Sequence, residues 1–180
     1  WDYDVPSQPT FYDFEKDGKV IKALAQTTKM GFVFLLNRET GEPIFPIEER
    51  EVPQGAVEGD YVTKTQPFPS KPAPLTPTYL DPEEVFGFTP WDRGYCKKAA
   101  EDLRNEGLYT PPSLEGSVHY PSAIGGANWG GPAVDASRNI LIANTMNLSS
   151  TIVMVPRKDC DKALKELARD SVQSRFSALQ

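Results

Sequence analysis

The chain has 180 residues and a net charge of −6, with 39% hydrophobic and 24% charged residues. That length suits one domain with its own core, and the composition is typical of an ordinary globular protein. The acidic balance, with no basic stripe, argues against a nucleic-acid partner, and no apolar run approaches the roughly 20 residues needed to cross a bilayer. The prolines gather between Pro43 and Pro90, which favours extended connections over long helices there.

The first third of the chain predicts strands. Residues 19–26 alternate partly between apolar and polar, and residues 31–36 are a short apolar run rich in β-formers. A turn follows, in which Gly41 can adopt a positive φ, and residues 43–47 are a plausible return strand. Together these segments predict a small antiparallel meander.

From Glu48 to Phe88 the sequence predicts mostly a connection. It holds the proline-rich run 65–72, and a connection this long inside a compact domain is usually functional or covers another surface. Its aromatic residues Phe68 and Tyr79 favour a packed crossing over disorder.

A helix is predicted over residues 90–106. Thr89 can cap it, Pro90 suits its first turn, and Gly107 suits its end. Apolar residues recur every four positions along one stripe, which predicts packing against the core. The stripe consists of Trp91, Tyr95, Ala99 and Leu103, with Cys96 and Ala100 beside it.

The last third returns to strands, predicted at residues 130–135, 139–144 and 151–155. The tail predicts a helix over residues 159–178, with apolar positions from 163 to 176 on one face. Such a helix could lie on the surface and cover the sheet.

The predicted elements fall into two groups of short antiparallel strands. Strands of one blade occupy residues 1–50, an insertion with the helix follows over 51–116, and the next blade strands occupy 117–157. This rhythm of short strands and tight turns is typical of a β-propeller.

Several segments resemble, in the same order, the membrane-bound PQQ-dependent glucose dehydrogenases, a quinoprotein family. The segments are Trp1–Thr10 (WDYDVPSQPT), Thr28–Gly41 (TKMGFVFLLNRETG), 65–69, 107–113, 129–131 and 142–146. The resemblance implies a mainly β fold that is part of an eight-bladed propeller, with PQQ on its axis. This chain would be an internal fragment of one and a half to two blades.

The resemblance also implies an activity. The whole protein would oxidise glucose to its lactone, with PQQ as hydride acceptor and ubiquinone as electron acceptor, on the periplasmic side of the bacterial inner membrane. The membrane anchor, the remaining blades and the calcium ligands would lie outside this chain, so the chain alone is expected to be inactive. A PQQ-dependent alcohol or polyol dehydrogenase and a non-catalytic propeller scaffold remain open as alternatives.

Five residues are carried over from the family as site candidates. Asp2 matches the general base, and Lys29 matches a lysine that contacts the PQQ quinone. Asn144 matches an asparagine near the cofactor, and Trp129 and Asn128 are further candidates for the same pocket. Without the resemblance, Asp2 would be interpreted as a turn cap and Lys29 as a solvated turn residue.

The remaining residues with distinctive chemistry do not form a motif. His119 is the sole histidine and has no acid or nucleophile near it in the sequence, so it is interpreted as a surface residue or as a structural residue with satisfied hydrogen bonds. Cys96 and Cys160 are too few and too far apart for a zinc motif. A disulfide and two buried thiols both remain open.

Overall fold

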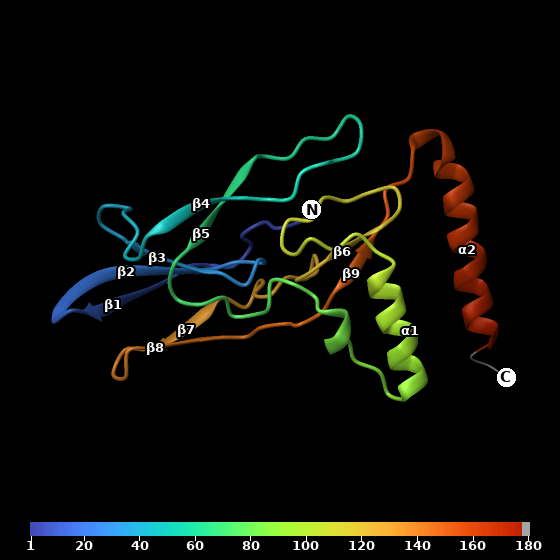
Figure 1. Ribbon diagram of the computed structural model, residues 1–180. Coiled ribbons are helices and arrows are strands. Elements are labelled where there is room, and N and C mark those ends of the chain that lie inside the picture. The colour runs from blue at the N-terminus through green and yellow to red at the C-terminus, as the bar shows by residue number, and fades with distance from the viewer. Residues whose placement is uncertain (178–180) are drawn as a thin grey trace.

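The computed structural model describes residues 1–177, with side chains described through Arg169. Its strands form four small antiparallel sheets with the orders β1-β2-β3, β4-β5, β6-β9 and β7-β8. In Figure 1 the strands extend toward one end of the molecule, and the helices α1 and α2 stand at the other. The described part is mainly β, as the sequence predicts.

The first sheet is the meander of β1 (Thr10–Lys16), β2 (Lys19–Thr27) and β3 (Val33–Asn37). Asp17 and Gly18 join β1 to β2 with φ angles of 52° and 70°, which suits the right-handed twist of a two-residue hairpin. The predicted meander is therefore confirmed, but β1 supplies its third strand. The predicted return strand 43–47 is wrong, because only Pro43 bridges to β3, at Leu36.

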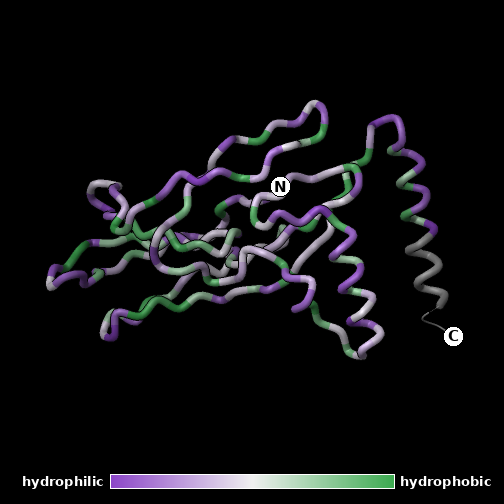
Figure 2. The backbone as a smooth tube through the Cα atoms, in the orientation of Figure 1, coloured by the Kyte–Doolittle hydropathy of each residue, from purple (hydrophilic) through white to green (hydrophobic). Residues whose placement is uncertain are grey.

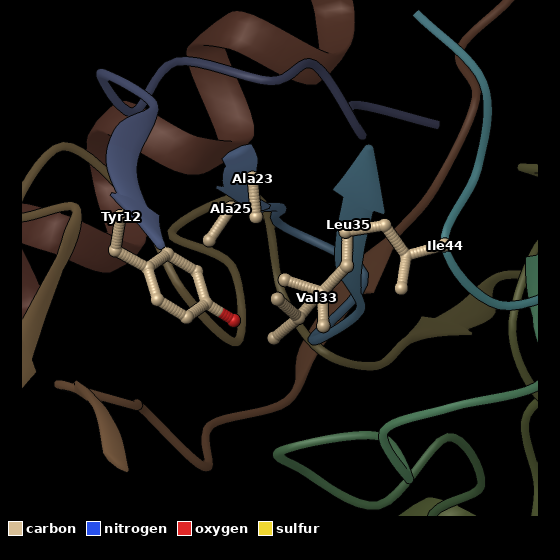
Figure 3. Packing of buried hydrophobic residues seen from close by; sticks show 6 residues of the cluster. All are labelled: Tyr12, Ala23, Ala25, Val33, Leu35 and Ile44. Carbon is tan, nitrogen blue, oxygen red and sulfur yellow. The ribbon is translucent and has the colours of Figure 1, made fainter. Parts of the chain in front are cut away.

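The core lies against one face of this meander. Ala23 and Ala25 are two residues apart in β2, so their side chains lie on the same face of the sheet, and both are fully buried. Their small side chains leave room for larger neighbours. The buried cluster is Tyr12, Ala23, Ala25, Val33, Leu35 and Ile44, whose side chains point into one shared space (Figure 3). Figure 2 shows hydrophobic stretches along these strands and hydrophilic residues at the turn that joins β1 to β2.

The predicted connection 48–88 contains a hairpin that the sequence analysis missed. Its strands are β4 (Ile47–Glu51) and β5 (Thr65–Pro69), followed by the short 3-10 helix η1 (Pro82–Glu84). Charged residues in β4 and prolines in β5 hide the pattern, and such residues are tolerated because the pair forms a sheet of two edge strands. The predicted packed crossing is confirmed at Phe68, whose ring lies 5.2 Å from that of Phe32.

The helix α1 spans Pro90–Glu101, and Thr89 caps it as predicted by accepting a hydrogen bond from the backbone N–H of Asp92. It ends before residue 106 because Arg104 leaves the helix to pair with Ser117 of the next sheet. The predicted core stripe is wrong except at Ala100, which is buried. Trp91 and Tyr95 are 83% and 77% exposed, and Tyr95 lines an open groove of about 500 Å³.

The last strands are β6 (Ser117–His119), β7 (Pro132–Asp135), β8 (Ile140–Ala143) and β9 (Ser150–Ile152). β7 and β8 form the predicted hairpin, and Val134 and Leu141 pack against the meander core. β9 pairs with β6, although the β7-β8 hairpin lies between them in the sequence.

The C-terminal helix α2 spans Cys160–Ser177, after the 3-10 turn η2 (Arg157–Asp159). The expectation that it covers the sheet is wrong, because it stands apart from the strands (Figure 1) with Leu164 and Leu167 more than half exposed. Residue 178 and the side chains of the apolar positions after Ala168 lie outside the described part.

Cys96 and Cys160 are both free and exposed, so neither the disulfide nor the buried thiols are found. Among the described helices, none is long and apolar enough to span a membrane.

Candidate active site

Lys29 lies in the turn between β2 and β3. The turn is closed by hydrogen bonds from the N–H of Thr28 to the carbonyl of Phe32 and from the N–H of Gly31 to the carbonyl of Thr28, both 3.0 Å. The side chain of Lys29 is only 9% exposed. Burying an ammonium is costly unless the charge is paired, so the position of this lysine requires partners.

The loop 122–128 presses against Lys29 from one side. Gly126 donates its N–H to the carbonyl of Lys29 at 2.7 Å, and Ala127 donates to Thr28 at 3.2 Å. Gly125 has a φ of +85°, and a β-carbon there would lie 2.6 Å from Cγ of Lys29. A side chain at residue 125 would therefore displace the lysine, so glycine fits both the backbone and the packing.

Two carboxylates also contact the side chain of Lys29. Its Nζ donates to Oδ1 of Asp2 at 3.0 Å and forms a second, closer ion pair with Asp4. Each carboxylate side chain is 57% exposed. The ion pairs raise the pKa of Lys29, with the hydrogen bond to Asp4 as the largest cause, and Lys29 in turn lowers the pKa of Asp4.

Tyr3 fixes the segment that carries both carboxylates. Its ring meets the ring of His119 at 4.5 Å and the ring of Tyr109 at 5.5 Å, each edge to face. Burial lowers the pKa of His119 to about 4 and raises the pKa of Tyr109 to about 12, so both are neutral at pH 7. The aromatic anchor is thus uncharged, and the carboxylates on either side of Tyr3 in the sequence contact Lys29 instead.

His119 is buried, and both of its ring nitrogens lack a hydrogen-bond partner among the described residues. The prediction of a surface histidine or of a structural histidine with satisfied hydrogen bonds is therefore wrong, because the residue is buried and has no hydrogen bond within the described residues. Its ring contacts Tyr3, the residue between the two carboxylates. The residues next to His119 in the sequence did not predict this contact.

The structure brings some of the predicted site residues together and separates others. Asp2 and Lys29 meet, and Asn128 belongs to the loop that presses on Lys29, with its Oδ1 buried and unpaired within the described structure. Trp129 is 77% exposed and lines a different groove, beside residues 8–11. Asn144 is exposed in the segment after β8, and its role stays a prediction.

Asp4 is the residue that the sequence analysis missed. The signal was present, because Asp2 and Asp4 are two residues apart and flank an aromatic residue. Period-two alternation puts such a pair on one side of the chain.

Small antiparallel sheets with a polar site among their connecting loops are typical of a β-propeller enzyme domain. The chain belongs to the family of PQQ-dependent glucose, ethanol and alcohol dehydrogenase β-propeller domains, which matches residues 1–179. The predicted fold class and the predicted family are both confirmed.

Similar proteins support the same assignment. The chain is 42% identical over 159 residues to a quinoprotein glucose dehydrogenase of Gluconobacter oxydans (strain 621H), covering 87% of this chain and 19% of the relative. It is 39% identical over 158 residues to the quinoprotein glucose dehydrogenase of Escherichia coli (strain K12), covering 87% and 20%. A glycerol dehydrogenase large subunit of Gluconobacter thailandicus is 37% identical, covering 89% and 22%.

The chain therefore spans about a fifth of the length of these relatives. No solved structure matches it.

The residues around Lys29 fit part of a PQQ site. PQQ presents carboxylates and quinone oxygens, which accept hydrogen bonds, and an ammonium has three N–H donors. Two of these donors face Asp2 and Asp4, which leaves one for an acceptor on a ligand. No group of three or more potential metal ligands occurs within the described residues.

Proposed function

We propose that the protein containing this chain oxidises glucose to its lactone with PQQ as hydride acceptor. Two quinoprotein glucose dehydrogenases at 42% and 39% identity support the substrate, and the Asp2–Lys29 pair carries the chemistry. Ubiquinone is proposed as the electron acceptor and calcium as the metal, with its ligands outside this chain. The proposal also puts the whole protein on the periplasmic side of the inner membrane, held by an anchor elsewhere in the sequence.

In this proposal Asp2 is the general base. Its carboxylate takes the proton of the sugar C1 hydroxyl as the C1 hydrogen leaves as hydride and the C1–O bond becomes a carbonyl. A side chain that is more than half exposed can reach a substrate, and its hydrogen bond to Lys29 fixes its direction. PQQ, when bound, supplies the acceptor for the hydride.

Lys29 is proposed to stabilise the negative charge that develops on the acceptor. Its raised pKa keeps the ammonium charged throughout the physiological range. A fixed cation in a shielded position stabilises developing charge more strongly than one in water.

A second candidate function keeps PQQ and changes the substrate. The relatives include glycerol dehydrogenase large subunits at 37% and 36% identity and a probable quinate dehydrogenase (quinone) at 33%. A polyol or alcohol is therefore the alternative substrate class. A non-catalytic scaffold would be indifferent to the identity of residues 2 and 29.

Dye-linked oxidation by the whole protein, loaded with PQQ and calcium, tests the proposal. Asp2→Asn is expected to lower kcat by about 100-fold or more, because it removes the base. Asp13→Asn is the matched control, since Asp13 is 59% exposed and pairs with Arg38 outside the site. Full activity of Asp2→Asn would refute the catalytic role of Asp2. A higher kcat/KM for glycerol than for glucose would refute glucose as the substrate and favour a polyol.

A further inference from the structure

We propose that Asp4 is the permanent counter-ion of Lys29, a positioning residue that leaves Asp2 free to exchange its proton during turnover. This inference rests on the proposed function and divides its two acidic side chains into separate roles. The two carboxylates have the same chemistry and the same exposure. They differ in their contact with Nζ of Lys29, which lies closer to Asp4 than to Asp2.

Two carboxylates share the one ammonium of Lys29. Nζ of Lys29 contacts Oδ1 of both Asp2 and Asp4, and the contact with Asp4 is the closer one. Asp4 is also the largest cause of the raised pKa of Lys29. The stronger partner of the lysine is therefore the residue that has no assigned role in catalysis.

Lys29 is buried, so leaving its ammonium unpaired is costly. A base becomes neutral each time it takes a proton from the substrate, so a lysine paired with Asp2 alone would lose its counter-ion in every cycle. Breaking the pair of a buried charge is strongly destabilising. With Asp4 in contact, the ammonium of Lys29 remains paired while Asp2 is protonated.

The segment that carries the carboxylates is held by aromatic contacts of Tyr3. Tyr3 lies between them in the sequence, and its ring packs against the rings of His119 and Tyr109. Gly125 packs against the stem of Lys29 and limits the directions in which the ammonium can move. Asp4 and Lys29 are thus both fixed, as a permanent ion pair requires.

The first measurement uses the protein without PQQ. Competitive labelling of Lys29 with acetic anhydride at a series of pH values, read by mass spectrometry, reports the loss of its proton. Asp4→Asn is expected to move the midpoint of labelling to lower pH, and by more than Asp2→Asn does. An equal or larger shift in Asp2→Asn would overturn the assignment.

The second measurement uses the PQQ-loaded whole protein. Asp4→Asn is expected to lower kcat about tenfold with KM for the sugar within about twofold, because Lys29 then holds Asp2 as its only counter-ion. Asp4→Glu keeps the charge and is expected to recover most of the loss. Asp13→Asn serves as the control for the loss of an equally exposed ion pair.

Wild-type kcat in Asp4→Asn would overturn the inference, and so would a failure of Asp4→Glu to recover activity while the protein melts at the wild-type temperature. The proposed function fails differently, through full activity of Asp2→Asn. The labelling of Lys29 does not depend on activity, so it identifies the stronger counter-ion whether or not Asp2 is the base.

Discussion

Replacing Gly125 by alanine tests the contact between the 122–128 loop and the lysine. A β-carbon at this position would lie 2.6 Å from Cγ and 2.9 Å from Cα of Lys29, where no atom fits without displacement. Overpacking costs about 1–3 kcal/mol, and the left-handed φ of +85° adds roughly 1–2 kcal/mol for a residue with a side chain. The expected loss is therefore about 2–5 kcal/mol, measured by urea unfolding followed by tryptophan fluorescence.

Gly18→Ala is the matched control for this substitution. Gly18 also has a positive φ, +70°, but a β-carbon there would meet nothing within 4 Å. It should cost only the backbone term of about 1–2 kcal/mol. Gly125→Ala is also expected to lower kcat, since it moves Lys29, whereas Gly18→Ala should not. Equal losses of stability and equal activities in the two variants would show that the loop does not position the lysine.

Three further substitutions test other parts of the structure. Burial lowers the pKa of His119 from 6.5 to about 4, so the unfolded chain binds this proton first as the pH falls. Stability should drop by up to about 3 kcal/mol between pH 6.5 and 4, and His119→Phe should lack this component in urea unfolding at both pH values. Identical pH dependences would contradict the burial. Thr89→Ala should cost about 1 kcal/mol and speed amide exchange in the first turn of α1, whereas Thr89→Ser should not. Ser7→Ala removes a buried hydrogen bond of 2.8 Å to the carbonyl of Thr27 and should cost about 1–3 kcal/mol. Its exposed counterpart, Ser137→Ala, should stay within about 0.5 kcal/mol, and equal losses would count against the buried bond.

Local sequence patterns predicted the elements whose neighbours lie close along the chain. β2, β3 and the β7-β8 hairpin carry apolar runs bounded by turn residues, and the cap at Thr89 depends on its own turn. The pairing of β6 with β9 could not be predicted in this way, because 30 or more residues separate the partners. The proline-rich β5 lacks a strand pattern altogether.

The apolar stripe on α1 shows that a sequence pattern can predict a helix without predicting the burial of its apolar face. Its periodicity correctly predicts a helix, but periodicity does not say whether the rest of the described structure covers that face. Trp91 and Tyr95 are exposed along it.

The candidate site depended more on resemblance than on pattern. Asp2 and Lys29 are ordinary surface residue types, and only the family match suggested that they meet. Asp4 was missed because the match assigned a role to one acid of the pair. The position of His119 behind Tyr3 arises from the β6-β9 pairing, which no local signal specified.

The carboxylates and the ammonium differ in how they are attached to the molecule. Residues 1–9 belong to no strand and are held by side-chain contacts such as those of Tyr3 and Ser7, whereas Lys29 is fixed between two paired strands. Loss of the Tyr3 contacts would therefore move the carboxylates without moving the cation, whereas loss of the pairing between β2 and β3 would move the cation itself.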